Sequence, residues 1–265
     1  MKQNNYYSIT AVEKALDVLE TLGQQGRGLT LLELSNLLEI PKSTLFRYLL
    51  TLEARGYVEK DEANRKYELG LKAFELGSLA MARLTVREIA LPLMHDLLDQ
   101  FNETVNLAIR DQCDVLYIEI LESPQAIKMA SQVGKHDFIH ATSLGKAILA
   151  FLPEEEVNSI AHTTGLPRRT ENTITTLPEL REELIRVRQR GYAIEDMENE
   201  YGARCVGAPI INRRGEAIAA MSIAGPADRF SKATMESMGD ALLKATSQIS
   251  QKLGYLSRGG KSSGR

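Results

Sequence analysis

The segment from Leu29 to Gly70 constrains the fold most, because it combines two short helical patterns, a sharp break and a hairpin. Thr30 and Glu33 have the spacing of a capping box, which predicts the start of a helix at this point. Pro41 ends that helix and opens another, since proline is tolerated in a first helical turn and disfavours a helical residue before it. The first helix should place three leucines at helical spacing on its inner face: Leu31, Leu34 and Leu38.

The second helix has an apolar face and a polar outer side. Leu45, Leu49 and Leu52 share the apolar face. The polar groups cluster at its N-terminal end and on the outer side, namely Lys42, Ser43, Thr44, Arg47 and Tyr48. Arginine, lysine and hydroxyl groups bind base edges and phosphates when such a helix enters the major groove. We expect Ser43, Thr44 and Arg47 to contact bases and Lys42 to contact phosphate.

A hairpin follows the second helix. Gly56 can end the helix, and residues 57–60 and 66–69 then alternate around a turn at residues 61–65. This order predicts a winged helix-turn-helix, with Arg65 and Lys66 reaching phosphate or the minor groove. The alternative is a small helical subdomain of an enzyme, because such subdomains also carry lysine and arginine on solvated faces.

Length and charge limit the class of protein. A chain of 265 residues is expected to form two domains. The net charge of -3 excludes a generally basic nucleic-acid coat, so DNA affinity must come from a local positive patch. Cys113 and Cys205 lie too far apart in sequence for a CxxC pair, which argues against a disulfide scaffold or a structural zinc site. With no signal-peptide pattern and no apolar run of membrane length, the sequence predicts a cytoplasmic protein without a membrane partner.

The N-terminal third contains two further helical patterns. Apolar residues from Ile9 to Leu22 follow helical spacing, and Gly23 is expected to end that helix. Residues 71–84 are apolar around the whole helix and therefore need a partner, either the same helix of a second subunit or another part of the same subunit. The expected organisation is a DNA-binding domain at 1–70, a linker helix at 71–85, a ligand-binding domain at 86–256 and a flexible tail at 257–265.

The C-terminal part mixes strands and helices and predicts an α+β domain around one central sheet. The expected strands are residues 105–109, 115–121, 126–133, 206–211 and 217–223. The expected helices are residues 86–98, 144–151, 154–162, 177–190 and 231–253.

Three segments together resemble the IclR family of transcriptional regulators. They are residues 41–52 with 56–58, residues 140–147, and residues 191–209 continuing to 226 and Arg229. The resemblance covers about residues 8–256. It implies a winged helix-turn-helix, a linker helix used in dimerisation, and a GAF-like domain that binds a small organic, sugar or aromatic acid. The implied assembly is a homodimer on double-stranded operator DNA, with a dimer of dimers as a further arrangement.

The resemblance also implies which residues line the effector cavity. Carried over by motif position, they are Met129, Ser143, Leu144, Gly145, Glu195, Ala203, Cys205, Ser222 and Ala224. Glu195 stands where the family frequently has aspartate, and Ala224 where a serine is common. The cavity therefore loses a hydroxyl and gains a longer carboxylate, so no member's effector can be transferred directly.

Elementary chemistry adds expectations for this cavity. Residues 142–146 enter a helix whose free N–H groups attract a carboxylate, and Gly145 permits close approach of the ligand. The alternative is that Ser143 only caps the helix. Glu195 and Ser222 can bond hydroxyl or carbonyl groups, which favours a hydroxy- or keto-acid.

The sequence favours a repressor of a catabolic operon that its ligand releases, with ligand-dependent activation as the alternative. Two other functions stay open: a sensing module that no longer uses DNA, and a thiol-dependent enzyme in which Arg204 activates Cys205. No histidine lies close in sequence to Cys205 to act as a base. No cofactor or metal is expected, because His136 and His140 are four residues apart without a third ligand.

Overall fold

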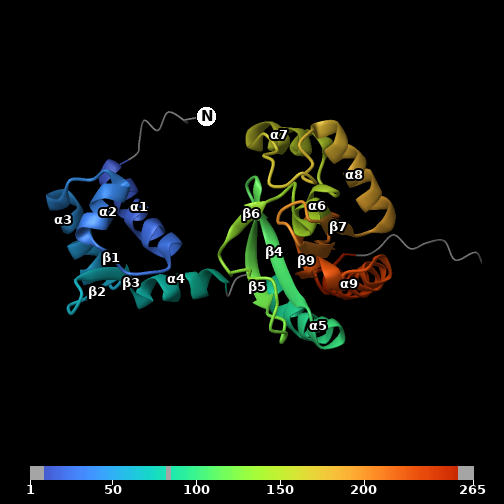
Figure 1. Ribbon diagram of the computed structural model, residues 1–265, viewed down its shortest axis with the longest axis horizontal. Helices are drawn as coiled ribbons and strands as arrows, with labels where there is room; N and C mark the ends of the chain where they lie inside the picture. Colours follow the sequence, from blue (N-terminus) through green and yellow to red (C-terminus); the bar gives the residue numbers. More distant parts are fainter. Residues whose placement is uncertain (1–8, 82–84, 256–265) are drawn as a thin grey trace, which may run out of the picture. The chain divides into compact units, whose positions relative to one another are not determined.

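The computed structural model describes residues 9–81 and 85–255, which divide into two compact units at residues 83 and 84 (Figure 1). The expected flexible tail at 257–265 lies outside the described residues, as do residues 82–84 of the linker. The two units are described separately below.

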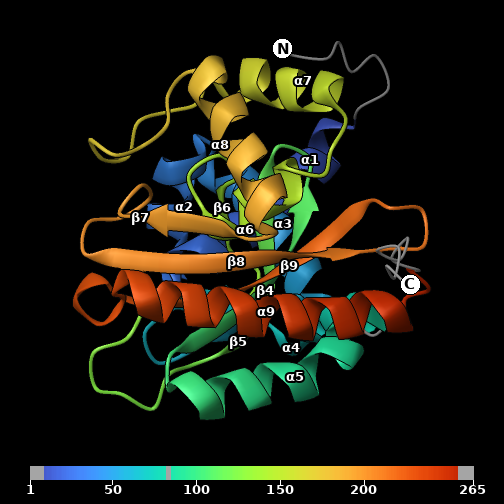
Figure 2. The same cartoon turned by 90° about the vertical axis from the view of Figure 1, so that its right-hand side faces the viewer.

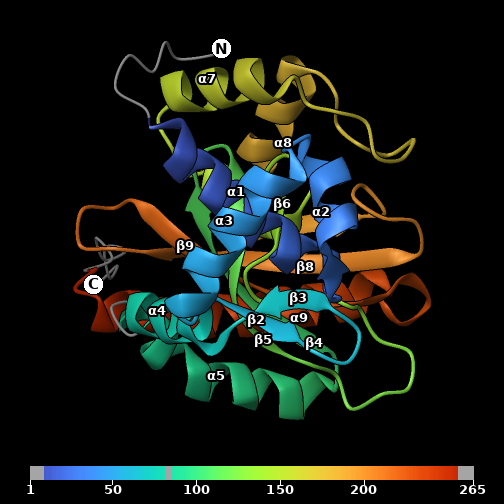
Figure 3. The same ribbon diagram turned by 90° about the vertical axis from the view of Figure 1, so that its left-hand side faces the viewer.

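The N-terminal unit is a winged helix-turn-helix (Figure 3). Its helices are α1 (Thr10–Gln25), α2 (Leu31–Leu38), α3 (Lys42–Ala54) and α4 (Leu71–Met81). Its strands are β1 (Leu29–Thr30), β2 (Val58–Asp61) and β3 (Lys66–Leu69), which form an antiparallel sheet in the order β1-β3-β2. The capping box exists: Thr30 Oγ1 accepts from the Glu33 amide at 3.2 Å, and Glu33 Oε2 accepts from the Thr30 amide at 2.8 Å.

Helix α1 differs from the expectation. It continues through Gly23 to Gln25, and the next residue, Gly26, has a φ of 59°, the left-handed conformation that glycine adopts without steric cost. Val18 and Leu22 are buried, whereas Val12 is 54% and Leu16 51% exposed. Helical spacing predicts that Val12, Leu16 and Leu22 share a core-facing side, but only the C-terminal half of α1 reaches the core of this unit, through Leu22 and through Val18, which the pattern did not include.

The C-terminal unit contains a six-stranded antiparallel sheet in the order β6-β5-β4-β9-β8-β7. The strands are β4 (Thr104–Asp111), β5 (Asp114–Leu121), β6 (His136–Phe138), β7 (Ala193–Asp196), β8 (Ala203–Ile211) and β9 (Ala217–Pro226). The helices are α5 (Thr85–Phe101), α6 (Ser143–Leu149), α7 (Glu154–Thr164), α8 (Leu177–Arg190), the 3-10 turn η1 (Ala227–Arg229) and α9 (Lys232–Lys252). The α+β prediction with one central sheet is confirmed.

Helices cover both faces of this sheet (Figure 2). Helices α5 and α9 pack beside each other and against β4 and β8. On the other face, α6, α7 and α8 form a core with side chains from the strands, including Ala108, Tyr117 and Ala220. Every residue of α6 is buried, so this short helix is held rigidly against the sheet.

The predicted strand at residues 126–133 is wrong. This segment is not a strand, and its apolar residues Ile127 and Val133 are 72% and 54% exposed. The chain pairs with β5 only afterwards, where His136 lies opposite Leu116. Alternation of apolar residues predicted a strand, but an alternating segment without a neighbouring strand cannot form the ladder of hydrogen bonds. Strand β7 was not predicted.

Within residues 9–81 and 85–255, no helix is long and apolar enough to cross a membrane.

Candidate functional site

The outer face of α3 exposes the groups expected to contact DNA. Lys42, Ser43 and Arg47 are exposed, while Thr44 is half-buried and Tyr48 packs partly against the core of the N-terminal unit. Leu45 and Leu49 point inward and are fully buried. The helix therefore presents a solvent-facing polar surface from a rigid support.

The same face carries two apolar side chains that sequence reasoning missed. Phe46 is 43% exposed and Leu50 is 47% exposed. Phe46 lies three residues after Ser43, and Leu50 lies three residues after Arg47 and four after Phe46, so all four share one side of the helix. The signal was present in the sequence, because the burial of Leu45 and Leu49 leaves positions 46 and 50 pointing away from the core.

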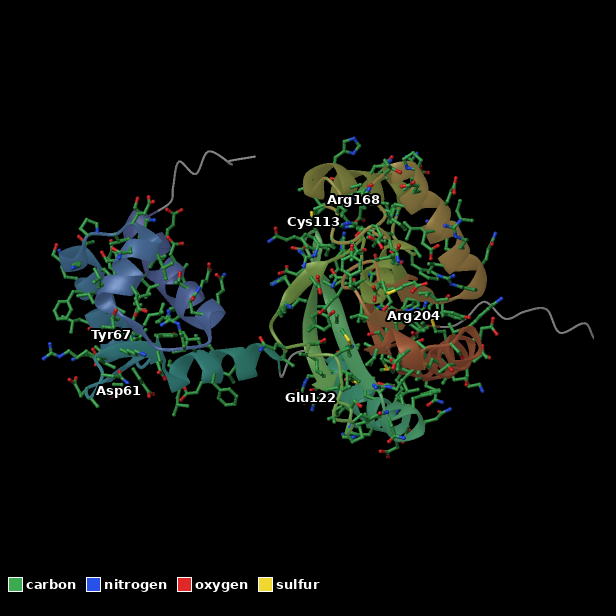
Figure 4. All side chains as sticks on the ribbon, in the orientation of Figure 1. Asp61, Tyr67, Cys113, Glu122, Arg168 and Arg204 are labelled. Carbon is green, nitrogen blue, oxygen red and sulfur yellow. The ribbon has the colours of Figure 1, made fainter. Side chains whose placement is uncertain are left out.

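The tip of the wing is held by local hydrogen bonds. Asp61 Oδ1 accepts from the Ala63 amide at 2.8 Å, and Asn64 Oδ1 accepts from the Lys66 amide at 3.0 Å. Arg65 has a φ of 57° at the turn and is exposed, and Lys66 is half-buried. Figure 4 marks the hairpin by Asp61 and by Tyr67, the buried residue that fastens β3 to the core. The turn thus holds Arg65 out into solvent.

The C-terminal unit contains a cavity of about 530 Å³ above the sheet. The residues that were expected there and line it are Met129, Ser143, Leu144, Glu195, Ala203, Cys205, Ser222 and Ala224. Gly145 is the one expected residue that is not part of the lining. Segments more than 90 residues apart in sequence therefore meet at one cavity.

Strand register explains why these side chains converge. Glu195 of β7 lies opposite Cys205 of β8, which lies opposite Ala224 of β9. Ser222 lies opposite Asn106 of β4. Because alternate residues of a strand face the same side, this pairing aligns the cavity residues across four neighbouring strands.

At the start of α6, the N-cap residue and the reason for the glycine at position 145 both differ from the expectation. Thr142, not Ser143, is the N-cap, and its Oγ1 accepts from the Gly145 amide at 3.1 Å. A Cβ on Gly145 would lie 1.9 Å from the carbonyl oxygen of Ile139, so backbone packing, and not ligand approach, requires glycine there. Gly207 likewise lets β8 approach the backbone of Ser143, which a Cβ would meet at 2.8 Å.

The cavity is also lined by charged residues that the sequence analysis did not predict. Lys135, His136 and Arg169 contribute the basic groups, and the guanidinium of Arg169 lies 5.3 Å from the ring centroid of Phe138. Asp114, Asp137 and Glu200 contribute carboxylates. Neither Lys135 nor Arg169 belongs to a helix or strand, so no periodicity in the sequence marked them.

Glu195 is a buried carboxyl group at the cavity wall. Its Oε1 accepts from the amides of Glu198 at 2.8 Å and Asn199 at 3.2 Å. Burial raises the pKa of Glu195 to about 7, against the lowering effects of the Cys205 and Asn199 hydrogen bonds. Near neutral pH this group exists in both forms, so it can donate or accept a hydrogen bond.

A buried ion pair supports the loop that follows β7. Lys146 of α6 is 1% exposed and pairs with Glu198. The carbonyl oxygen of Glu198 accepts from Thr173 Oγ1 at 2.6 Å. Burial raises the pKa of Glu198, opposed by the charge of Lys146. These contacts fix the loop on which Asn199 reaches the cavity.

Cys205 does not have the surroundings of a nucleophile. Burial and the neighbouring Glu195 raise the pKa of its thiol well above the ordinary value. Arg204, which was the expected activating charge, instead binds Asp196 Oδ1 at 2.6 Å and the carbonyl oxygens of Ala227 and Phe230 at 3.1 Å. The thiol is held in its neutral form.

Comparison with known proteins assigns both units. Residues 11–62 match the IclR helix-turn-helix domain, and residues 78–251 match the bacterial transcriptional regulator IclR C-terminal domain. The chain is 36% identical over 242 residues to the HTH-type transcriptional regulator BhcR of Paracoccus denitrificans, covering 91% of this chain and 86% of BhcR. It is 34% identical over 244 residues to the HTH-type transcriptional repressor AllR of Salmonella typhi, covering 92% of this chain and 90% of AllR.

A solved structure gives the same result. The crystal structure of an IclR homolog complexed with 4-hydroxybenzoate from Microbacterium hydrocarbonoxydans is similar with a TM-score of 0.80 and 27% identity, covering 92% of this chain and 99% of that chain. These relatives are transcriptional regulators and not enzymes, which removes the thiol-dependent reaction. The chain belongs to the IclR family of bacterial transcriptional regulators.

Proposed function

We propose that this regulator is a repressor of a catabolic operon and that a small organic acid bound in its C-terminal cavity releases it from operator DNA. The observation that carries the proposal is the cavity itself, which is lined by polar groups and lies in a different unit from the DNA-reading helix. AllR, a relative named as a repressor, and the homolog complexed with 4-hydroxybenzoate support it.

DNA recognition is assigned to α3 and the wing. Ser43, Thr44 and Arg47 read base edges in the major groove, and Lys42 holds phosphate. Arg65 and Lys66 hold phosphate beside the recognition helix. The charge of the chain is -3, so binding depends on these local cations and weakens steeply as salt rises.

The carboxylate of the effector is assigned to the basic groups among the cavity lining. Arg169 and Lys135 supply charge and directed N–H donors, and guanidinium groups bind carboxylates through paired hydrogen bonds. This replaces the start of α6 as the expected anchor, because Thr142 already occupies the Gly145 amide. Glu195 and Ser222 face the remainder of the ligand.

The operator-binding form is assigned as a homodimer joined through α4. Leu71 and Phe74 are each 72% exposed and Leu79 is 66% exposed. Burial of these apolar side chains against a second copy of the chain would remove their surface from water and stabilise a dimer. A two-fold dimer also presents two recognition helices to paired half-sites of the DNA. An effector that prefers one arrangement of the dimer then shifts the equilibrium between bound and free DNA.

The test is operator binding with and without ligand. Fluorescence anisotropy on the gene's own upstream region at low salt should show specific binding that Arg47→Ala weakens and that a matched change far from α3, Arg181→Ala, leaves unchanged. A panel of small acids should contain one that lowers DNA affinity. Failure of the wild type to bind, or equal binding by Arg47→Ala, would contradict the assignment of α3.

A further inference from the structure

Phe46 lies among the polar groups of α3 that are assigned to DNA. It belongs to the second turn of the helix and is 43% exposed, although its neighbour Leu45 is fully buried. Ser43 lies about one turn before it and Arg47 follows it directly, and both are exposed. A single exposed apolar side chain is common on protein surfaces, so the position of Phe46, and not its exposure alone, is informative.

The charge of this helix is complementary to DNA. Residues 42–52 contain no Asp or Glu. The ion pairs among the described residues of the N-terminal unit include neither Lys42 nor Arg47, so both cations are available to phosphates and base edges. No side chain caps the first turn of α3, which leaves amide groups there for a phosphate as well. These features favour a DNA duplex, and not an apolar protein surface, as the partner of Phe46.

The chemistry of Phe46 selects one group in the major groove. Its side chain has no hydrogen-bond donor or acceptor, so it cannot pair with the nitrogen and oxygen atoms of the base edges. The 5-methyl group of thymine is the apolar group that a base pair presents there. Recognition helices bring their N-terminal residues to the bases, and Phe46 lies near that end.

We propose that Phe46 reads the 5-methyl group of a thymine in the operator through apolar contact. The inference rests on the proposed function, because it adds a specificity-determining residue to the helix assigned to DNA recognition. Ser43 and Arg47 read hydrogen-bonding groups, whereas Phe46 distinguishes a thymine from bases that lack the methyl group.

Leu50 is a matched comparison on the same helix. It is 47% exposed and shares one side of α3 with Phe46. It lies four residues, or about 6 Å, further from the N-terminus of the helix. Because base contacts are concentrated at the N-terminal end of a recognition helix, we expect Phe46, and not Leu50, to touch a thymine.

Deoxyuridine tests this contact, because uracil pairs as thymine does and lacks only the 5-methyl group. Footprinting with the full chain first locates the operator in the gene's own upstream region. Fluorescence anisotropy then measures binding to duplexes in which each thymine is replaced in turn. At one thymine or more, the wild type should lose about fourfold in affinity, as expected when one buried methyl group is removed.

Variants assign the lost affinity to Phe46. Phe46→Ala should bind the thymine operator more weakly and should lose no further affinity on the deoxyuridine duplex, because the two changes remove the same contact. Phe46→Leu keeps an apolar side chain and should retain most of the preference for thymine. Leu50→Ala is the control and should keep the full fourfold preference. Both positions lie outside the buried core of the N-terminal unit, so the substitutions leave its packing intact.

The outcomes separate the inference from the proposed function. If the wild type binds the operator and no deoxyuridine weakens it, the inference is wrong and the assignment of α3 to DNA stands. The same holds if Phe46→Ala keeps the full preference for thymine, or if Leu50→Ala removes it and Phe46→Ala does not. If the wild type binds no upstream sequence at low salt, the proposed function and the inference fail together.

Discussion

Glu195 makes the stability of the C-terminal unit depend on pH. Its pKa is about 7 in the folded protein against an ordinary value of 4.5, so between these pH values the folded state keeps a proton that the unfolded state releases. Stability therefore falls as pH rises through this window. Glu195→Gln should stabilise the unit by up to about 3 kcal/mol at pH 8 and by almost nothing near pH 4.5, from about 1.4 kcal/mol per pKa unit.

Calorimetric unfolding at several pH values measures this effect, with Glu155→Gln on an exposed position of α7 as the control. The titratable groups that face Glu195 are Lys146, Glu198 and the neutral thiol of Cys205, and the substitution keeps all three side chains in place. If Glu195→Gln raised the free energy of unfolding equally at pH 4.5 and pH 8, the prediction would be wrong, and hydrogen bonding instead of charge would limit stability at this site.

Gly145 was predicted to line the effector cavity, but the structure requires glycine there for backbone packing. Its missing side chain is required by the carbonyl of Ile139 at 1.9 Å from the position of a Cβ. Gly145→Ala should destabilise the C-terminal unit by about 3 kcal/mol, since overpacking against backbone cannot relax easily. Gly77→Ala on α4 is the control: nothing lies within 4 Å of its Cβ, and it should gain about 0.5–1 kcal/mol in its own unit.

We expect helix α3 to divide its DNA contacts between phosphates and base edges. Lys42→Ala should weaken all DNA sequences about equally and reduce the slope of log affinity against log salt by about one. Arg47→Ala should cost about 1–3 kcal/mol on the preferred sequence and less on others. Anisotropy at four salt concentrations, on a selected operator and on a shuffled duplex, separates the two effects. Equal slopes for wild type and Lys42→Ala would remove Lys42 from the phosphate contacts.

Helices with clear capping and terminating residues were predictable from the sequence. The predicted bounds of α8 are those observed, because Thr176 caps its start, Pro178 occupies the first turn and Gly191 takes a φ of 86° after its end. Where such local signals were absent, the prediction failed. Residues 126–133 alternate as a strand does, but no neighbouring strand pairs with them. Pairing depends on the rest of the sheet, which periodicity within one segment cannot reveal.

At the scale of the whole molecule, the exposed face of α4 predicts self-association. Phe74→Glu places a charge on a side chain that is 72% exposed, so it should leave the unit folded and prevent burial against a second copy. Sedimentation velocity should show the wild type as a dimer and the variant as a monomer, with operator affinity reduced more than tenfold because two half-sites are no longer read together. Glu75→Ala, one residue away and paired with Lys72, is the control. A dimeric variant would assign the interface elsewhere.

The candidate cavity was predictable only where family motifs covered it. Ser222, Cys205 and Glu195 were found in that way. Asn106, Asn199 and Arg169 also line the cavity, but they come from β4 and two loops that carry no motif, so only the fold brings them together. The DNA-reading surface was more accessible to sequence reasoning, because α3 and the wing are contiguous in the chain and their contacts are local.

The alternation of β8 and β9 has a consequence for how such regulators diversify. Cys205, Ser222 and Ala224 face the cavity, whereas their neighbours Val206 and Ile223 are fully buried on the opposite side of the sheet. A substitution at a cavity position therefore leaves the packing beneath it intact. Selection can retune the sensor to a new metabolite one residue at a time, while the scaffold that carries the signal stays unchanged.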